Sequence, residues 1–366
     1  TNPPIDAIRE EVVTDTTVYI GDDGNLLEEW AENCRVLQVR DPILTSTDLM
    51  KIRYMKKPGF HVETVSILYY KNTPLERALD RLFVAVDRAY RNGANVVILS
   101  DRGVDENHVA IPSLLAVSAI EQYLVRTKKR TAVSIVLESA EPRDVHHFAA
   151  LLGYGARAIN PYLAQETIVA LIEDGQLDKD FHVAVDDYNA AILHGIVKIA
   201  SKMGISTLQS YQSAQIFEAV GISKEVIDKY FTNTVSRVGG IGLKEIGELV
   251  DRNHTRAFDP LGLGTSLELD SLGAHKARAG REDHLYNPQT IHLLQESTRR
   301  GDYGLFRQYT ALVDDETRPH TLRGLLEMKY ADTPIPLEEV EPVESIVKRF
   351  KTGAMSYGSI SQEAHE

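Results

Sequence analysis

Acidic and polar side chains directly follow the most apolar runs of the chain. Asp101 comes shortly after Val96–Leu99, Glu138 comes after Thr131–Leu137, and Asn160 follows a shorter extended stretch. Runs rich in β-branched residues are typical of strands buried on both faces of a parallel sheet. Ligands of such sheets bind beyond the carboxyl ends of the strands. Asp101 and Glu138 are therefore candidate acid–base groups.

A simpler interpretation applies to the turn after Leu99, which reads Ser100-Asp101-Arg102-Gly103. Aspartate and arginine side by side at the end of a strand often form a structural pair that holds the turn. We favour this structural pair of Asp101 with Arg102 over an active-site acid.

A second candidate site is the glycine-rich stretch Ser236–Gly242, which precedes an apolar helix. Backbone amides of Gly239, Gly240 and Gly242 at the N-terminus of that helix would suit a phosphate, with Arg237 as the counter-charge. The stretch has no P-loop lysine and no dinucleotide fingerprint. A tight turn that requires glycine is the competing interpretation.

The histidines and the cysteine do not indicate a metal site. His146 and His147 are adjacent, and neighbouring residues on a helix point about 100° apart, so we expect one core and one surface histidine. Four further histidines are scattered through the C-terminal half and are expected to be solvated loop residues: His254, His275, His284 and His292. The lone Cys34 excludes an internal disulfide and cannot supply the cysteine set of an iron–sulfur cluster.

Apolar periodicity predicts the elements that must position these residues. Strands are expected at 36–39, 60–70, 96–99, 131–137, 156–159 and 205–208, an extended run at 12–20, and helices at 6–11, 45–50, 74–93, 112–127, 142–153, 186–204 and 214–220. Strands that alternate with helices predict an α/β fold with parallel strands flanked by helices, either an open sheet or a partial (β/α) barrel.

The C-terminal third has a different composition. Residues 252–288 are rich in Gly, His, Arg and Asp with little apolar period, which predicts a long irregular region on the surface. Short helices are expected at 291–294 and 303–312. Three prolines among glutamates then predict a stiff acidic connector, so we place a main domain at 1–337, a linker at 338–351 and the start of a further domain at 352–366.

Composition narrows the class of partner. The 366 residues are 43% hydrophobic, enough for a substantial core, and carry a net charge of −13 without a block of Lys or Arg. This balance argues against nucleic acid or an anionic membrane surface as a partner. No apolar run approaches the roughly 20 residues needed to span a bilayer, and we expect a cytoplasmic protein.

Several longer segments of the sequence resemble the central domain of the glutamate synthase large subunit. They are TNPPIDAIRE at 1–10, LSDRGV at 99–104, IPSLLAVSAIEQYL at 111–124, RDVHHFAALLGYGARAINPYLA at 143–164, KIASKMGISTLQSYQSAQIFEAVG at 198–221, SRVGGIGL at 236–243 and TGAMSYGSISQEAHE at 352–366. In that family the last of these segments, at 352–366 here, forms the start of the flavin domain. The resemblance therefore implies a piece of a larger protein.

The resemblance also implies a function. The parent enzyme would make L-glutamate from L-glutamine and 2-oxoglutarate, with ammonia passing from an amidotransferase domain to FMN, and this segment would connect the two domains without a catalytic residue of its own. FMN would lie beside Ala354, Met355 and Ser356 once its domain follows, and an iron–sulfur cluster, a small subunit or ferredoxin would belong to the parent. Relatives usually carry Met-Ser-Leu near the ammonia path where this chain has Thr14-Asp15-Thr16.

The rival interpretation is a stand-alone α/β enzyme. It would bind a phosphate-bearing small molecule at Gly239–Gly242 and use Asp101 or Glu138 as acid or base.

Overall fold

The computed structural model describes residues 6–259, 261–264, 271–315 and 320–351. The chain divides into two compact units, residues 1–265 and 266–366, and each is described by itself. Expected features at 352–366, including Ala354, Met355 and Ser356, lie outside the described residues.

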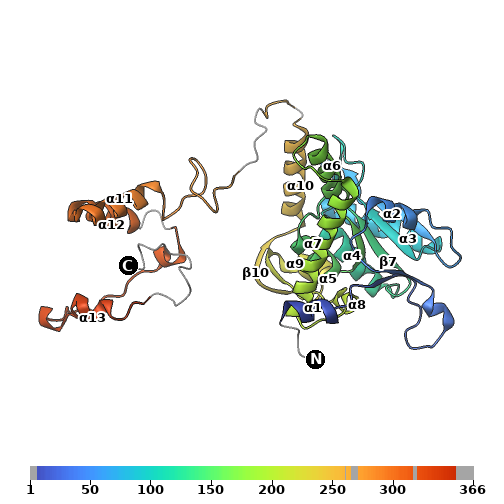
Figure 1. Ribbon diagram of the computed structural model, residues 1–366, viewed down its shortest axis with the longest axis horizontal. Coiled ribbons are helices and arrows are strands. Elements are labelled where there is room, and N and C mark those ends of the chain that lie inside the picture. Colours follow the sequence, from blue (N-terminus) through green and yellow to red (C-terminus); the bar gives the residue numbers. More distant parts are fainter. Residues whose placement is uncertain (1–5, 260, 265–270, 316–319, 352–366) are drawn as a thin grey trace. The chain divides into compact units, whose positions relative to one another are not determined.

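The first unit contains strands and helices in near-regular alternation (Figure 1). Its strands are β1 (Val18–Gly21), β2 (Val36–Val39), β3 (Val62–Ser66), β4 (Leu68–Tyr70), β5 (Val96–Ser100), β6 (His108–Ala110), β7 (Ser134–Glu138), β8 (Ala156–Asn160), β9 (Glu218–Ile222) and β10 (Val235–Ile241). Its α-helices are α1 (Ala7–Val13), α2 (Ser46–Arg53), α3 (Leu75–Arg91), α4 (Ser113–Arg126), α5 (Val145–Gly153), α6 (Tyr162–Glu173), α7 (Phe181–Lys202), α8 (Leu208–Tyr211), α9 (Lys224–Tyr230) and α10 (Leu243–Phe258). A short 3-10 helix spans Ala31–Cys34.

The central sheet has the order β3-β5-β7-β8, and every neighbouring pair is parallel. It is an open sheet, and no closed barrel forms among the described residues. The expected α/β class is therefore confirmed. Three two-stranded sheets surround it: β1 with β2, β4 with β6, and β9 with β10.

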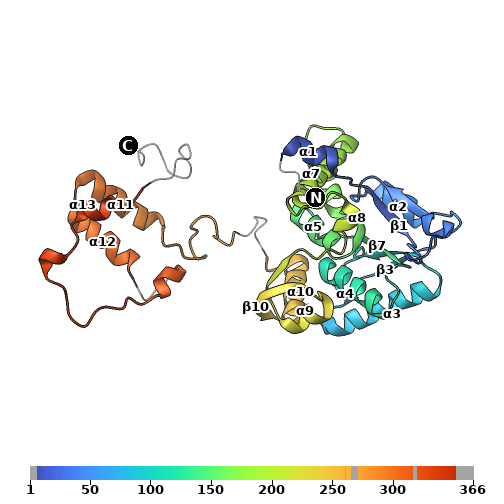
Figure 2. The same cartoon turned by 90° about the horizontal axis from the view of Figure 1, so that it is seen from below.

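Side chains alternate across the central sheet and build two cores. Val97, Leu99, Ile135 and Leu137 face the larger core, whose helical side comes from α3, α4, α5 and α7. Their alternate neighbours, such as Val136, face a smaller core closed by β1 and α2. Figure 2 shows β3 and β7 between α2 and β1 on one side and α3 and α4 on the other. Burial on both faces explains why these strands are apolar throughout.

Several helix starts differ from the expected ones because polar side chains cap the helices at other places. α5 begins at Val145 instead of Pro142, since the Asp144 carboxylate accepts from the amide of His146. α7 begins at Phe181 instead of Asp186, with Asp180 as its N-cap. α3 begins at Leu75, one residue later than expected, and its N-cap residue Pro74 makes no side-chain capping bond.

The structure of residues 205–222 differs from the one expected from the sequence. Instead of a strand at 205–208, Thr207 makes a single parallel bridge to Asp15 and then caps the short helix α8. Instead of a helix at 214–220, the chain forms strand β9. The run that was expected to be extended from Val12 is still helical as far as Val13. The conformation of these short segments is determined by pairing with residues far away in the sequence, and local periodicity carries no information about such pairing.

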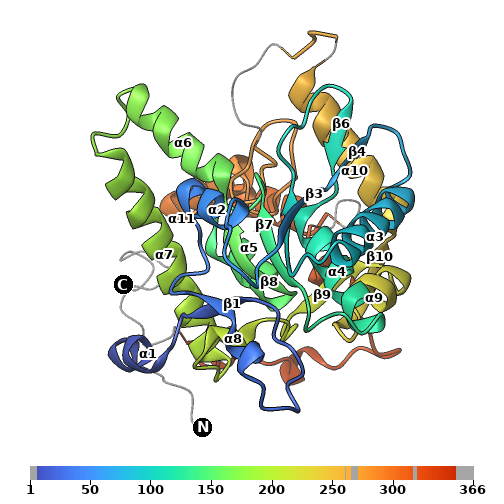
Figure 3. The same ribbon diagram turned by 90° about the vertical axis from the view of Figure 1, so that its right-hand side faces the viewer.

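The glycine-rich stretch at 236–241 is also a strand, β10, rather than a loop. It pairs in parallel with β9, and α10 then begins after Gly242. α10 continues to Phe258, so the irregular region expected from residue 252 begins only after this helix. Figure 3 shows α10 beside β4 and β6, and α6 beside α7 at the other edge of the unit.

The second unit is largely helical where it is described. α11 (Pro288–Arg300) and α12 (Tyr303–Val313) pack against each other, and α13 (Val343–Val347) follows later. The helices expected at 291–294 and 303–312 are confirmed, although α11 is longer. Short 3-10 helices span Leu322–Leu325 and Leu337–Glu339. Across the described ranges, none of the helices has the length and apolar character required to cross a bilayer.

Candidate functional site

The carboxyl ends of three central strands bring polar residues into one row. Ser100 at the end of β5 lies in register with Glu138 at the end of β7, and Glu138 lies in register with Asn160 at the end of β8. Parallel strands place these residues at the same edge, as the sequence predicted. All three residues are more than 90% buried.

Glu138 is the centre of a buried ion network. Its Oε2 atom accepts hydrogen bonds from Ser100 Oγ and from Arg53 Nη2 at the end of α2, both at 2.6 Å. Its Oε1 atom accepts from Arg102 Nε at 2.8 Å. Burial alone would raise the pKa of Glu138, but the bonds from Ser100, Arg102 and Arg53 hold that pKa below its ordinary value. Glu138 is therefore an ionised structural carboxylate.

The network extends from Glu138 to α6. Arg102 Nη2 donates to Glu166 Oε1 at 3.0 Å, and its guanidinium carbon lies 3.8 Å from the centre of the Tyr162 ring. One arginine thus joins the sheet edge to a helix by an ion pair and a cation–π contact. Together with Arg53, it fixes α2 and α6 over the carboxyl ends of the strands.

Asp101 does not pair with Arg102, so the expected structural pair is wrong. Its carboxylate instead accepts from Ser139 Oγ at 2.6 Å and from the amide of Ala140 at 3.0 Å, which joins the turns after β5 and β7. Burial raises the pKa of Asp101, and these two bonds oppose that effect. With only 2% of its surface exposed, Asp101 is closed off from a substrate in solution.

Asn160 ties the segment after β2 to the sheet. Its Nδ2 atom donates to the carbonyl of Leu44 at 2.9 Å, and Gln165 Nε2 donates to the same carbonyl at 3.0 Å. The amide of Leu44 in turn donates to the carbonyl of Ile159. The sheet edge is thus held by hydrogen bonds that position backbone and helices.

The residues of the expected anion site lie around the start of α10. Gly239 and Gly240 belong to β10, and Arg237 Nη1 donates to Glu218 Oε1 on β9 at 2.6 Å. The amide of Gly242 donates to Glu245 Oε2 at 2.9 Å. The backbone amides of Glu245 and Gly242 lower the pKa of the Glu245 carboxyl. The chain's own carboxylate thus lies where an external anion would bind.

Thr14 and Asp15 lie where α1 ends and meet a distant segment. The amide of Asp15 donates to the carbonyl of Ser206, and the amide of Leu208 donates to the carbonyl of Asp15. The Asp15 carboxylate accepts from the amide of Thr17, which lowers the pKa of Asp15. The Thr14 hydroxyl oxygen is buried, and no hydrogen bond reaches it from the described residues.

The histidines take structural positions. His146 is exposed and His147 is half-buried, where its Nδ1 atom accepts from the amides of Arg143 and Asp144 at the start of α5, so neither is the expected core residue. His254 is buried on α10 rather than solvated, with Nε2 at 2.7 Å from the carbonyl of Asp105. Within the described ranges, no group of three or more His, Cys, Asp or Glu side chains could hold a metal ion.

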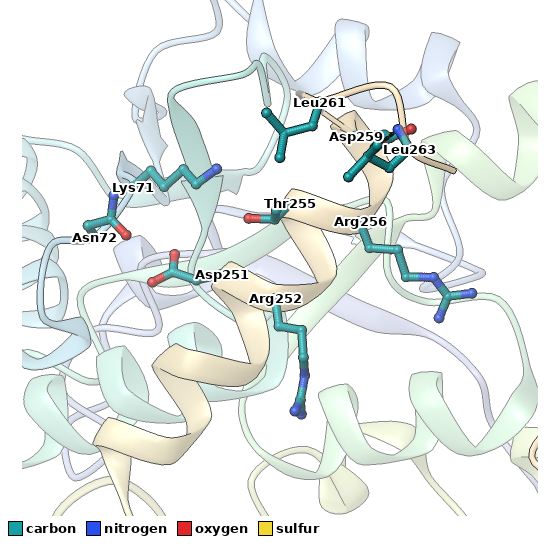
Figure 4. A pocket seen from close by; sticks show the side chains of 9 residues that line it. All are labelled: Lys71, Asn72, Asp251, Arg252, Thr255, Arg256, Asp259, Leu261 and Leu263. Carbon is teal, nitrogen blue, oxygen red and sulfur yellow. Dashed lines mark hydrogen bonds between the residues drawn. The ribbon is translucent and has the colours of Figure 1, made fainter. Parts of the chain in front are cut away.

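Sequence reasoning missed a cleft of about 460 Å³ beside α10, whose lining residues are mainly of charged and polar types. Figure 4 shows the side chains of Lys71, Asp251 and Thr255 pointing into this space, while those of Arg252 and Arg256 point away from it. The signal was hidden because residues from 252 onward read as a loop. The apolar helix expected after Gly242 is present, but the sequence did not indicate that it continues as far as Phe258.

Comparison with known families gives two matches. The family described as glutamate synthase central domain matches residues 1–223, and the one described as conserved region in glutamate synthase matches residues 284–366.

Individual relatives match over the whole chain. The chain is 48% identical over 366 residues to the glutamate synthase [NADPH] large chain of Bacillus subtilis, and covers 24% of that protein. It is 39% identical to the glutamate synthase [NADH] of Schizosaccharomyces pombe, covering 18%, and 39% identical to the ferredoxin-dependent glutamate synthase 2 of Synechocystis, covering 25%. The chain thus spans about a quarter or less of the length of these relatives. It belongs to the glutamate synthase family and carries the central domain of that family.

Proposed function

We propose that this chain is the connecting segment of a glutamate synthase that makes L-glutamate from L-glutamine and 2-oxoglutarate. The segment joins an amidotransferase domain to an FMN-binding synthase domain and has no catalytic centre of its own. Residues 1–337 form the connecting domain, 338–351 the linker, and 352–366 the start of the synthase domain.

The observation that carries this proposal is the closed carboxyl edge of the sheet. In α/β enzymes this edge is open and holds the substrate. Here Arg53 and Arg102 saturate Glu138, and Asp101 is bonded to Ser139 and Ala140. Both carboxylates are committed to holding helices and turns in place, which suits a scaffold.

The cofactors of the parent enzyme belong to other parts of it. The single cysteine, Cys34, cannot supply the three or more thiolates of an iron–sulfur cluster. FMN is assigned to Ala354, Met355 and Ser356 together with the domain that follows. The parent enzyme works in the cytoplasm and receives its electrons from a small subunit or from ferredoxin. The names of the relatives support these two routes, since they include NADPH, NADH and ferredoxin.

We place the ammonia path of the parent near Thr14 and Asp15. The Thr14 hydroxyl is buried with no hydrogen bond from the described residues, so it can bond to a small molecule that passes. Asp15 anchors the backbone of this place through Ser206 and Leu208. This position lies between the end of α1 and the start of α8, two segments far apart in the sequence.

The proposal is tested by assaying the 366-residue chain and the parent enzyme side by side. The chain alone should neither hydrolyse glutamine nor form glutamate, and the parent should do both. Measurable turnover of either reaction by the chain would refute the connecting role. A thermal shift with sugar phosphates that is abolished by Arg237→Ala would favour the rival, a phosphate-binding enzyme.

A further inference from the structure

A second, mainly apolar cavity lies on the outer side of the helical layer. It has a volume of about 370 Å³ and is lined by residues of α4, α5, α9, α10 and β9 and of the segments next to them. This volume falls within the range of small-molecule sites, which is about 300–1,000 Å³. The cavity is distinct from the closed sheet edge and from the cleft at Lys71.

Aromatic rings form one wall of this cavity. The Tyr154 and Phe217 rings stack with centroids 5.8 Å apart, and Phe231 meets Tyr154 edge to face at 5.3 Å. Rings that pack against one another in this way have few alternative rotamers, so the wall is preformed. Such a wall suits the flat face of another aromatic ring.

One polar group in this apolar lining has hydrogen-bonding capacity left over. The hydroxyls of Tyr154 and Thr234 bond to each other at 2.8 Å, and the two residues are 4% and 7% exposed. Two hydroxyls have two protons, and their mutual bond uses one of them. No other hydrogen bond to either oxygen occurs among the described residues. The remaining proton is therefore a buried donor on a pair of residues that both line the cavity.

The carboxylate among the residues that line this cavity already has a partner. Glu218 is paired with Arg237 at 2.6 Å. An adjoining cavity of about 320 Å³ shares Leu114, His146 and Ala150 with the first, and there the Glu141 carboxylate accepts from the amide and hydroxyl of Ser113. A neutral ligand therefore meets no unpaired carboxylate from Glu218 or Glu141.

We propose that this cavity binds a small, neutral aromatic molecule that carries one hydrogen-bond acceptor, such as a ketone or ester oxygen. The ring of the ligand lies against Tyr154, Phe217 and Phe231. Its acceptor oxygen accepts a hydrogen bond from the hydroxyl of the Tyr154–Thr234 pair whose proton is not used within the pair. Binding there would link α4 and α5 to the β9–β10 layer.

Two probes of similar shape separate the polar from the apolar contribution. Acetophenone carries a ring and a carbonyl acceptor, and ethylbenzene carries the ring alone. Binding to the 366-residue chain is measured by calorimetric titration and by saturation-transfer NMR. We expect saturable one-to-one binding of acetophenone, about 3- to 10-fold tighter than that of ethylbenzene, which is the effect of one hydrogen bond.

Three substitutions locate the site. Tyr154→Phe and Thr234→Val each remove one hydroxyl while keeping the shape, and each should weaken acetophenone binding about 3- to 10-fold without changing ethylbenzene binding. Ala150→Leu, which fills the shared part of the two cavities, should block both probes. Tyr211→Phe is the matched control, because it removes a buried tyrosine hydroxyl that has no partner and lies outside the cavity lining. It should leave binding unchanged.

The proposal fails if neither probe binds saturably. It also fails if acetophenone binds equally to the wild type, Tyr154→Phe and Thr234→Val, because the spare proton would then play no part. Equal weakening by Tyr211→Phe would show a general loss of packing instead of a site. Since glutamate formation by the parent enzyme is not measured, these outcomes are independent of the connecting role.

Discussion

Glu138 shows how a residue that resembles a catalytic acid can be structural. It sits at the end of a buried strand, where an active-site group would stand, but three donors surround it. Two of them come from arginines on different segments. The role of Glu138 is structural: it holds helix α2, through Arg53, and the turn after β5, through Arg102, against the sheet.

We predict that Glu138→Gln lowers the free energy of unfolding by about 2–4 kcal/mol. Breaking a buried ion pair typically costs about 3–5 kcal/mol, and the partial exposure of Arg53 and Arg102 reduces this. Urea unfolding at pH 7 measures the loss. Glu166→Gln is the matched control, because that carboxylate is 52% exposed and its pair with Arg102 should contribute less than about 1 kcal/mol. Equal losses for the two variants would contradict this account.

The effect of Glu138→Gln on the free energy of unfolding should depend on pH. Because the folded pKa of Glu138 is lowered, its stabilising effect is present above its unfolded pKa, near 4.5, and disappears as the pH falls through the folded value. The stability difference between the wild type and Glu138→Gln should therefore shrink below pH 4.5. A difference that stays constant down to pH 3 would show that shape, and not charge, is responsible.

Asp41 behaves in the opposite way. Burial, together with the nearby charge of Asp48, raises the pKa of Asp41 to about 6, although its carboxylate accepts from the amide of Ile43 at 2.8 Å. The ionised form is therefore destabilising above pH 6, and Asn at this position keeps the acceptor without the charge. We predict that Asp41→Asn stabilises the chain by about 2 kcal/mol at pH 7.5 and gives no gain below pH 4. A loss of stability at pH 7.5 in urea unfolding would refute it.

At the scale of elements, β9 and β10 show why glycines occur at 239–240. Neither glycine has a positive φ angle and both lie on a strand, so a tight turn that requires glycine does not explain them. At Gly240 a Cβ atom would lie 2.8 Å from the Cα atom of Gly221 and closer still to its carbonyl, whereas at Gly239 it would meet no atom within 4 Å. Gly240 is required by the close approach of two strands.

This difference predicts the behaviour of two neighbouring substitutions. Gly240→Val should destabilise the chain by about 1–3 kcal/mol, because the backbone of Gly221 must move. Gly239→Val should cause no loss, since the side chain enters open space on a strand. Thermal unfolding by circular dichroism compares them. Similar melting temperatures for both variants would mean that the approach of β9 to β10 is not tight.

Some elements were predictable and others were not, for physical reasons. Strands β5, β7 and β8 are buried on both faces, so their apolar runs predict them directly. Strand β9 was mistaken for a helix because Glu218–Ile222 is short and takes its conformation from pairing with β10. The row of Ser100, Glu138 and Asn160 followed from the strand ends, but the arginine from α2 did not. Arg53 lies 85 residues from Glu138 in the sequence, and no local pattern joins them.

At the scale of the whole chain, the first unit has a core of its own and should fold without a cofactor. Far-UV circular dichroism at 222 nm follows the helices of this unit, α3, α4 and α7 among them. We predict one cooperative urea transition by this signal, unchanged by added FMN. Several steps, or folding that requires FMN, would contradict a self-sufficient core.

We propose that this segment guides ammonia between two domains and performs no reaction itself. The most direct measurement follows isotope transfer in the parent enzyme, with glutamine labelled with ¹⁵N at the amide and an excess of unlabelled ammonium in solution. Wild-type enzyme and the control Thr167→Leu, an exposed position on α6, should transfer the label to glutamate undiluted. Thr14→Leu should dilute the label and let glutamine hydrolysis outpace glutamate formation. Undiluted transfer in Thr14→Leu, with both rates equal to those of the control, would contradict the account.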